Sequence, residues 1–455
     1  MELLSRGGKP VTDFNSALLT DFYEIVMAAA YFESDQVHKF GVFEMFTRRL
    51  PRNRKYLIAA GLEQVIQYLL NFRFKSEDIT FLKSQKPLSN IGDKFFEYLL
   101  ALKFTGDVWA VPEGTVVFPY EPLIRVEAPI VEAQIIETYL LSVMNFQTLI
   151  ASKASRIVSA AAGRPVIEFG SRRAHGPNAS VLAARASFIG GCQGTSNTLA
   201  AFSMNIPVSG TMAHSFIMNF DTEEEAFLTF SQVFPSSTLL IDTVDPIQAI
   251  AKIKKLGIGV AAIRIDSGDL LAISKMVRKL LDEAGYGSTK IMASGDLNET
   301  TIYELLSGSA PIDLFGVGTE LSTSRDDPAL DGSYKLVAIK IGSNRKEKYE
   351  LRYRQKLSPG KHTYPGPKQV FRFLRGGKIE RDLLTLEGDT IDGGTPLLIQ
   401  YISQGQLVRK LPSLINSQAE CKEQLKTLPD SYLDLGPELQ ISPVVISDKL
   451  KQIIV

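Results

Sequence analysis

The chain has 455 residues, 45% of them hydrophobic and 22% charged, a balance typical of a folded protein with two or three domains and ample core. Its 50 basic residues balance its 50 acidic ones, so the composition gives no sign of a nucleic acid or a membrane surface as a partner. Cys192 and Cys421 are the only cysteines, which excludes a disulfide framework and a cysteine-rich metal site and favours a reducing, cytoplasmic setting.

The first residues, MELLSRGGKPVTDF, have no apolar core of signal-peptide length, and no apolar run in the chain is long enough to cross a bilayer.

The N-terminal 150 residues are predicted to mix helices and strands. Helical spacing of the apolar residues predicts helices over residues 18–32 and 135–161. Aromatic and β-branched residues predict strands over residues 39–50 and 120–129.

Short apolar runs alternate with helical patterns after about residue 165. The runs are VIEFGS (166–171), IPVSGTMA (206–213), TLLIDTVD (238–245), VAAIRIDSGD (260–269), KIMASGD (290–296) and IDLFGVGTE (312–320). Apolar strands alternating with helices are typical of a parallel sheet covered by helices. Six such units in a row favour a barrel over an open sheet.

The alternation ends near residue 330. The segments YKLVAIKI (334–341) and YELRYRQKL (349–357) are predicted to form an antiparallel pair. HTYPGPKQVFRFL (362–374) combines prolines and glycines with basic residues, and GDTIDGGT (388–395) is interpreted as a turn.

Polar side chains follow each apolar run, at the end where barrel enzymes carry their chemistry. They are Arg172, Arg173, Thr211, His214, Asp242, Asp245, Arg264, Asp266, Asp269, Ser294, Asp296 and Thr319. Asp245 and Asp269 are best interpreted as caps of the helices that follow them. Arg264 and Asp266 are two residues apart within one run, so they share a face and need either each other or a ligand as partner.

Two further features indicate a ligand with phosphate groups. Gly295 precedes a predicted helix, and Gly316 and Gly318 end the last run, where backbone N–H groups at helix starts bind phosphate. The carboxylates can hold Mg²⁺ with a polyphosphate or bind ribose hydroxyls, and the arginines can bind anions.

His214 lies among small and apolar residues in GTMAHSFIM (210–218). Such a setting suits a core histidine, a nucleophile or a proton shuttle.

The chain resembles the nicotinate phosphoribosyltransferases over most of its length. The matching segments, in the family's order, are LLTDFYEIVMAAAY, FEMFTRRLP, YLIAAGLE, EFGSRRAHGP, GTMAHSF, LLIDTVD, IRIDSGD, SGDLNE, FGVGTEL and PGPKQVFR. The resemblance implies transfer of phosphoribose from phosphoribosyl pyrophosphate to nicotinate in NAD salvage, coupled to hydrolysis of ATP with Mg²⁺ as cofactor.

The resemblance also implies an architecture. It predicts an incomplete α/β barrel of the type II phosphoribosyltransferase kind over residues 136–334. A second α+β domain is expected from both chain ends, residues 1–135 and 335–455. The family forms homodimers with shared active sites, so a cytoplasmic homodimer is expected here.

The matching positions receive roles by resemblance. His214 is the histidine that ATP phosphorylates, Asp242 the carboxylate on its other ring nitrogen, and Arg264 and Asp266 face the phosphoribosyl pyrophosphate. Phe169 and Tyr23 of the neighbouring subunit are expected to sandwich the pyridine ring. On the residues alone, Tyr23 serves equally well as a helix residue packed in its own core.

The remaining roles concern ionic groups. Arg172 is expected to face the nicotinate carboxylate or a nearby phosphate, and Asp242 and Asp266 are the candidate Mg²⁺ ligands. The residues expected to bind ribose and its 5′-phosphate are Asp21, Ser294, Gly295, Asp296, Gly318 and Thr319. The residues expected to bind ATP or pyrophosphate at the partner's site are Asp21, Arg325, Ser333 and Lys335. Without the resemblance, Lys335 is best interpreted as a solvated strand residue.

One position bears on substrate choice. Related nicotinamide enzymes carry an aspartate where Ser196 stands, and a neutral serine that can donate a hydrogen bond fits the acid better than the amide. A nicotinamide enzyme and a phosphosugar-binding barrel without this activity remain the alternatives. A phosphosugar aldolase or isomerase needs a lysine or glutamate base at a strand end, and Lys290 starts its run instead.

The chain departs from the family in three places. Ser171 and His175 occupy positions where relatives vary, and His175 is expected to serve the start of a helix. Pro367 stands where family members often carry arginine. The basic character of this late loop is then left to Lys361, Lys368 and Arg372, which puts a pyrophosphate-binding role of the loop in doubt.

Overall fold

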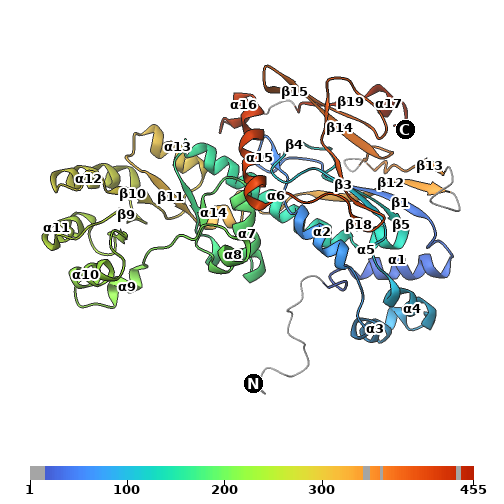
Figure 1. Ribbon diagram of the computed structural model, residues 1–455, viewed down its shortest axis with the longest axis horizontal. Coiled ribbons are helices and arrows are strands. Elements are labelled where there is room, and N and C mark those ends of the chain that lie inside the picture. Colours follow the sequence, from blue (N-terminus) through green and yellow to red (C-terminus); the bar gives the residue numbers. More distant parts are fainter. Residues whose placement is uncertain (1–15, 342–348, 359–361, 437–441, 455) are drawn as a thin grey trace.

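The computed structural model describes residues 16–341, 349–358, 362–436 and 442–454. It shows two parts on either side of one long helix, α6 (Glu137–Ala160) (Figure 1). Helix α6 packs against α7 (Pro177–Ile189) and α13 (Glu299–Ser307) on one side and against α2 (Leu62–Asn71) on the other. The two parts therefore share one rigid element.

The first part is built on a six-stranded parallel sheet. Its strands, in spatial order, are β7 (Gly194–Thr195), β6 (Val166–Glu168), β11 (Leu314–Val317), β10 (Lys290–Ala293), β9 (Ala262–Ile265) and β8 (Thr238–Leu240). The order ends at β7 on one side and at β8 on the other, so the curled sheet is a half-barrel that stays open between them. The predicted incomplete α/β barrel is thus confirmed.

One predicted strand is wrong. Residues 206–213 form only a single bridge, between Thr195 and Val208, and the sixth strand is the two-residue β7, which the apolar pattern did not reveal. Pro207 lacks an N–H and so limits a ladder at this edge. The carbonyl of Pro207 still accepts the Thr195 N–H at 3.0 Å.

Helices follow the strands as the alternation predicted. They are α8 (Thr198–Met204), α10 (Glu223–Val233), α11 (Pro246–Leu256) and α12 (Leu270–Glu283), besides α7 and α13. Asp245 accepts hydrogen bonds from the Ile247 and Gln248 N–H groups at the start of α11, and Asp269 accepts one from Ala272 in α12. The interpretation of both aspartates as helix caps is confirmed.

The second part is built mainly on a seven-stranded antiparallel sheet. Its strands, in spatial order, are β13 (Glu350–Tyr353), β12 (Gly332–Ile341), β1 (Phe40–Thr47), β5 (Ile124–Pro129), β3 (Asp107–Ala110), β17 (Ile399–Ser403) and β18 (Gln406–Leu407). The predicted pairing of residues 334–341 with the following strand is confirmed by β12 and β13. Strands from both ends of the chain meet in this sheet, because β1 pairs with β12.

Smaller elements complete this part. A four-stranded sheet has the order β16 (Thr395–Pro396), β14 (Lys368–Arg375), β15 (Lys378–Leu386) and β19 (Val444–Ile446), and β2 (Leu57–Ile58) pairs with β4 (Val116–Val117). The helices are α1 (Phe22–Glu33), α3 (Ser76–Lys83), α4 (Asp93–Ala101), α5 (Ile130–Ile135), α15 (Leu414–Thr427), α16 (Asp430–Leu433) and α17 (Asp448–Gln452). The helix predicted over residues 135–161 is interrupted at Ile136, where α5 ends and α6 begins.

The basic residues of the late segment are structural. Lys368 is buried and forms an ion pair with Glu44 at 2.7 Å, and Arg372 is buried against Asp382 at 2.6 Å. Neither side chain is available to a pyrophosphate, and Lys361 lies outside the described residues.

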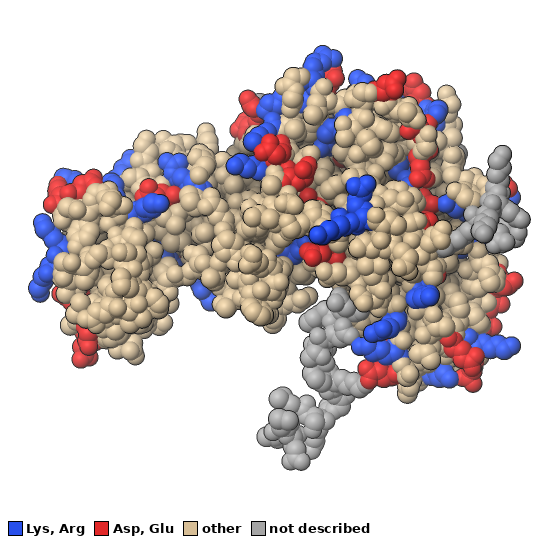
Figure 2. All heavy atoms as spheres, viewed as in Figure 1, with Lys and Arg blue, Asp and Glu red and all other residues tan. Residues whose placement is uncertain are grey.

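Two surface observations concern the described residues as a whole. Acidic and basic side chains are interspersed over the face shown in Figure 2. Within the described ranges, we find no helix with the length and apolar character needed to span a membrane.

Candidate active site

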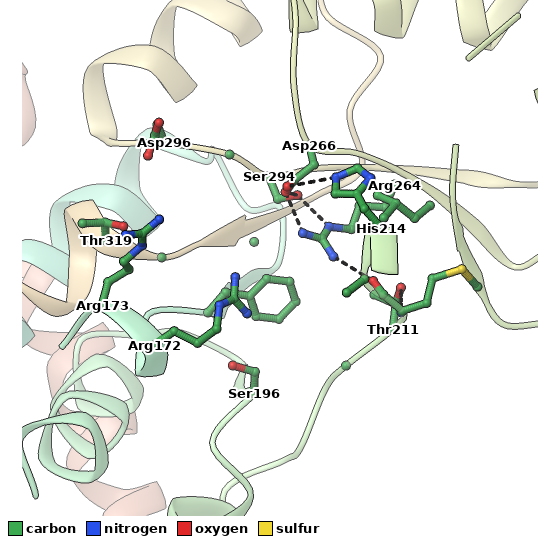
Figure 3. A pocket seen from close by; sticks show the side chains of 18 residues that line it. Arg172, Arg173, Ser196, Thr211, His214, Arg264, Asp266, Ser294, Asp296 and Thr319 are labelled. Atoms are coloured by element: carbon green, nitrogen blue, oxygen red, sulfur yellow. Dashed lines mark hydrogen bonds and ion pairs between the residues drawn. The ribbon is translucent and has the colours of Figure 1, made fainter. Parts of the chain in front are cut away.

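A pocket of about 580 Å³ lies at the carboxyl ends of the parallel strands, and it gathers most of the predicted site residues (Figure 3). The predicted residues that line it are Phe169, Arg172, Ser196, His214, Arg264, Asp266, Ser294, Gly295, Asp296, Gly318 and Thr319. Arg173 and Thr211, which also follow strands or predicted strands, line the same pocket. The carboxyl ends of parallel strands meet at one edge of a sheet, which explains why residues 150 positions apart converge.

Arg264 and Asp266 form a bonded pair at the centre of this wall. Arg264 Nη2 lies 2.6 Å from Asp266 Oδ1, and Arg264 Nε donates to Ser294 Oγ at 2.8 Å. The Ser294 hydroxyl donates in turn to Asp266 Oδ1 at 2.5 Å. Burial opposes ionisation of Asp266, but the bond from Ser294 and the charge of Arg264 outweigh it and lower the pKa of this carboxyl. The pocket therefore holds a fixed cation beside a fixed anion.

His214 stands on the pocket wall rather than in the core. It is the first residue of the short helix α9 (His214–Met218), and its side chain is 38% exposed. Its Nδ1 lies 3.0 Å from Thr243 Oγ1, and its Nε2 lies 3.8 Å from Asp266 Oδ2. The alternative of a packed core histidine is thereby ruled out.

Asp242 is placed differently from the expectation that it contacts His214. Its Oδ2 accepts hydrogen bonds from the Asp266 N–H and the Ser267 hydroxyl, both at 2.8 Å, and Thr243 takes the contact with the histidine ring. Both residues follow the end of β8, and of the two it is Thr243 that faces the His214 ring while Asp242 faces the Asp266–Ser267 segment. Asp242 does not line the pocket.

The ring of Phe169 depends on a glycine beneath it. A Cβ atom at Gly316, within β11, would lie 2.7 Å from two carbons of the Phe169 ring. The Arg264 guanidinium lies 5.7 Å from the centre of the same ring. Gly316 was expected to serve a phosphate site, but the structure shows that it makes room for the aromatic ring.

Glu168 is a buried residue that sequence reasoning missed. Its carboxylate accepts hydrogen bonds from the Thr195 hydroxyl at 2.5 Å and from the Gly170 N–H, and its carbonyl accepts the Ser196 N–H. Burial raises the pKa of Glu168, although both hydrogen bonds oppose that shift. Glu168 thus ties the turn at Gly170 to Thr195 of β7 and to Ser196, the residue that follows β7. A charged residue ending the apolar run VIE was the signal available in the sequence.

The side of the pocket that lies away from His214 and Arg264 is formed by the segments after β10 and β11. Gly295 has φ +90°, and a Cβ there would lie 1.9 Å from the Asp266 carbonyl oxygen, so only glycine fits. In Figure 3, Asp296, Thr319 and Arg173 lie on one side of the pocket and His214 and Arg264 on the other. The start of α13 is capped by Asn298, whose side chain accepts from the Thr301 N–H, so that N–H group of the helix start is already engaged.

Five predicted residues lie away from this pocket. Asp21 and Tyr23 are exposed at the start of α1, and Ser333 and Lys335 lie on β12. Lys335 is 3.6 Å from Glu137, and Ser333 accepts a hydrogen bond from Arg48. Arg325 follows the short helix α14 (Thr319–Ser322), with its side chain 63% exposed and 3.3 Å from Glu320. The single chain does not bring these residues to its own pocket.

Two further positions are placed by the structure. His175 is exposed and lies just before Gly176, the N-cap of α7, with no side-chain cap on that helix. Across the described ranges, no three His, Cys, Asp or Glu side chains are grouped as a ready metal site.

Comparisons with known proteins show which family the chain resembles. The model of the nicotinate phosphoribosyltransferase (NAPRTase) N-terminal domain matches residues 18–145, and that of the nicotinate phosphoribosyltransferase family matches residues 165–351. The nicotinate phosphoribosyltransferase pncB2 of Mycobacterium tuberculosis is 44% identical over 95% of this chain and 92% of its own length. The nicotinate phosphoribosyltransferase of Bacillus subtilis is 43% identical over 80% of this chain and 74% of its own length.

Solved structures show the same likeness in three dimensions. Human nicotinic acid phosphoribosyltransferase superposes with a TM-score of 0.82 at 27% identity, covering 95% of this chain and 98% of that one. A nicotinate-nucleotide pyrophosphorylase from Pyrococcus furiosus superposes with a TM-score of 0.73 at 25% identity, covering 92% of this chain and 98% of that one.

Proposed function

The chain belongs to the nicotinate phosphoribosyltransferase family, and on that basis we propose that it joins nicotinate to phosphoribosyl pyrophosphate, giving nicotinate mononucleotide and pyrophosphate. We further propose that hydrolysis of ATP is coupled to this step through a phosphohistidine at His214, within cytoplasmic NAD salvage. The observation that carries the proposal is the convergence of the family-matching residues, from Phe169 to Thr319, on one pocket.

The end of the pocket near Phe169 suits the pyridine ring. The ring can stack on Phe169, which adds about 0.5–1.5 kcal/mol beyond the burial of apolar area. Arg172 offers a cation for the nicotinate carboxylate, and Ser196 offers a neutral hydroxyl beside it. The pyridine nitrogen carries its own lone pair, so the reaction needs alignment rather than a general base.

The proposed transfer replaces one bond at the anomeric carbon of the ribose with another. The pyridine nitrogen forms a bond to the anomeric carbon while the bond from that carbon to the pyrophosphate oxygen breaks and pyrophosphate takes the electron pair. The ribose becomes cation-like on the way, and the low pKa of Asp266 keeps a carboxylate available beside it. Arg264, held by Ser294, supplies positive charge for the departing phosphates.

The residues present fit a magnesium ion. Asp242 Oδ1 is buried and has no hydrogen-bond partner among the residues that the structure describes, while Asp242 Oδ2 accepts from the Asp266 backbone N–H. Mg²⁺ is usually held by one or two carboxylates together with substrate phosphates. Asp266 lines the pocket and would be such a ligand, and Asp242, which lies behind it at the Asp266 backbone, would be the second. When bound, the ion neutralises charge that develops on the pyrophosphate.

His214 has the arrangement that a phosphoryl acceptor needs. In the proposed tautomer, Nδ1–H donates to Thr243 Oγ1 at 3.0 Å, which leaves the Nε2 lone pair free on the side of Asp266. Nε2 would bond to the γ-phosphorus of ATP as the bond to ADP breaks, and water would later release phosphate.

We also propose a homodimer with shared active sites. Phe22, Tyr23 and Val26 lie within one turn of α1 and leave between 40% and 48% of their surfaces exposed, and neighbouring exposed apolar residues are typical of an interaction surface. Asp21, Tyr23, Arg325, Ser333 and Lys335 would then serve the pocket of the partner. Mixing Tyr23→Ala with His214→Ala protein should restore ATP-stimulated activity, because mixed dimers contain one site in which both residues are intact; no recovery in confirmed mixed dimers would contradict the sharing.

A steady-state assay tests the whole proposal. Nicotinate, phosphoribosyl pyrophosphate and Mg·ATP should yield nicotinate mononucleotide and ADP, and a ³¹P spectrum after incubation with Mg·ATP should show phosphohistidine. Nicotinamide and quinolinate, offered as alternative acceptors, separate the related activities. A protein that binds the phosphoribosyl donor but transfers to none of these acceptors would be a binding protein of the same fold.

A further inference from the structure

The two turns that form the Asp296–Thr319 side of the pocket lead into one buried cluster of charges. The turn after β10 carries Asp296 and continues to Glu299, the first residue of α13. The segment after β11, which we call the Thr319 turn, passes from Thr319 through the short helix α14 and continues to Asp326. Both carboxylates enter a cluster with cations from α6 and from the N-terminal part of the chain.

The contacts in this cluster are close and shielded from water. Arg54 binds Asp326 with two hydrogen bonds, of 2.8 and 3.1 Å, and lies 3.4 Å from Glu299. Lys153 of α6 lies 2.6 Å from Glu299 and 3.1 Å from Asp326. The side chains of Arg54, Lys153 and Glu299 are 0%, 2% and 5% exposed. Each carboxylate is therefore shared by cations from two different segments.

The charges of the cluster depend on one another. Arg156 adds a third cation, 3.8 Å from Glu299, against two carboxylates. Burial opposes ionisation of Asp326, but hydrogen bonds and charges from Arg54 and Lys153 outweigh it and hold its pKa well below the usual range. Removing one member of such a cluster leaves an uncompensated buried charge, so its neighbours must move.

Unusual backbone conformations lie at both turns. Asp296 has φ +46° and Ser324 has φ +44°, in the left-handed region that residues other than glycine rarely adopt. The Ser324 hydroxyl accepts a hydrogen bond from Arg54 Nη2 at 3.1 Å, in the buried cluster. Such conformations persist where the surrounding structure holds them in place. Ser324 is thus tied directly to the cluster, and the Asp296 turn is linked to it through Glu299, three residues further along the chain.

We propose that Arg54, Lys153, Glu299 and Asp326 are positioning residues that set the distance between the Asp296 turn and the Thr319 turn. None of the four lines the pocket, so each acts through the backbone that it holds. The inference rests on the proposed function, in which these turns receive the ribose and its 5′-phosphate. It also assigns helix α6 a role in binding, since Lys153 links both turns to it.

The test separates the two substrates. In Lys153→Met, Glu299→Gln and Asp326→Asn proteins, KM for phosphoribosyl pyrophosphate should rise about tenfold or more, while KM for nicotinate should stay within about twofold, because only one end of the pocket shifts. Titration calorimetry with Mg²⁺ and phosphoribosyl pyrophosphate, without nicotinate, should show the same loss of affinity.

Arg185→Met is the matched control. Arg185 is equally buried and binds Glu113 with two hydrogen bonds, at 2.9 and 2.7 Å, but it touches neither turn. Its loss should lower Tm as the cluster variants do and leave both KM values near those of the wild type. A parallel rise of both KM values in the cluster variants, or a fall in Tm alone, would overturn the proposal.

The remaining outcomes are also decisive. If Lys153→Met does not fold, the near-isosteric Glu299→Gln and Asp326→Asn proteins decide the question. If the wild-type chain binds phosphoribosyl pyrophosphate but forms no nicotinate mononucleotide, the proposed transfer fails and calorimetry alone judges the positioning role. A wild-type chain that does not bind phosphoribosyl pyrophosphate overturns both.

Discussion

His214 Nε2 lies 3.8 Å from Asp266 Oδ2, so the candidate phosphoryl acceptor stands beside the carboxylate that is paired with Arg264. Nδ1 of the same ring is engaged by Thr243. In the proposed mechanism, this arrangement puts the phosphoryl acceptor and the carboxylate beside the ribose on one wall of the pocket, so the two partial reactions should be separable by substitution.

His214→Ala should abolish the stimulation of nicotinate mononucleotide formation by ATP while leaving basal transfer. The reason is that Phe169, Arg172, Arg264 and Asp266 remain, whereas the phosphoryl acceptor is gone. Rates measured with and without Mg·ATP check this, and the ³¹P signal of phosphohistidine should be absent.

Thr243→Val supplies the control for this experiment. It keeps the imidazole but removes the hydroxyl 3.0 Å from Nδ1, so phosphorylation should slow by about 10- to 100-fold without vanishing, since the ring loses its orientation and tautomer. Undiminished ATP coupling in His214→Ala would refute the phosphohistidine.

Ser196→Asp should weaken the use of nicotinate. A second anion beside the nicotinate carboxylate opposes binding by like-charge repulsion, so kcat/KM for nicotinate should fall at least about tenfold. Ser196→Asn, which is neutral and similar in size to aspartate, separates charge from bulk. If nicotinate preference over nicotinamide is the same in Ser196→Asp as in the wild type, Ser196 does not set the choice of base.

Gly316→Ala should displace the stacking ring. The added Cβ meets the Phe169 ring at 2.7 Å and Met292 Cε at 2.9 Å, and the ring is the group facing the pocket. KM for nicotinate should rise about tenfold with KM for phosphoribosyl pyrophosphate little changed. Gly259→Ala is the matched control, because its Cβ meets only Ser236 Oγ, at an ordinary 3.8 Å.

Glu24 should make stability depend on pH near neutrality. Burial on α1, helped by the neighbouring charges of Glu137 and Asp21, raises the pKa of Glu24 to about 7 despite hydrogen bonds from Thr20 and Thr138. Unfolded glutamate titrates near 4.5, so between about pH 4.5 and 7 the folded state keeps a proton that the unfolded state has lost. The stabilisation that protonated Glu24 contributes is therefore complete below about pH 4.5 and is lost as the pH rises through about 7.

The size of that effect can be measured by urea unfolding. The free energy of unfolding should fall by about 1–3 kcal/mol more in the wild type than in Glu24→Gln between pH 5 and pH 8, after allowance for partial solvent screening. Parallel pH profiles for the two proteins would contradict the raised pKa.

Part of the candidate site was predictable because it depends on local order. The spacing of Arg264 and Asp266 within one apolar run predicted that they share a face, and they form a bonded pair. The role of Gly316 was not predictable in this way, since it is decided by the Phe169 ring on a neighbouring strand. Likewise, no local pattern could show that Lys368 and Arg372 form buried ion pairs with Glu44 and Asp382.

The sequence by itself determined the alternation of strands and helices, the caps at Asp245 and Asp269, and the polar residues at the strand ends, because periodicity and capping act within a few residues. Only the tertiary structure decided that β7, not residues 206–213, ends the sheet, and that Thr243, not Asp242, meets His214. It alone brought Arg54, Lys153, Glu299 and Asp326 together. These contacts join segments up to 272 residues apart, and their geometry follows from strand register and helix packing, which no local pattern records.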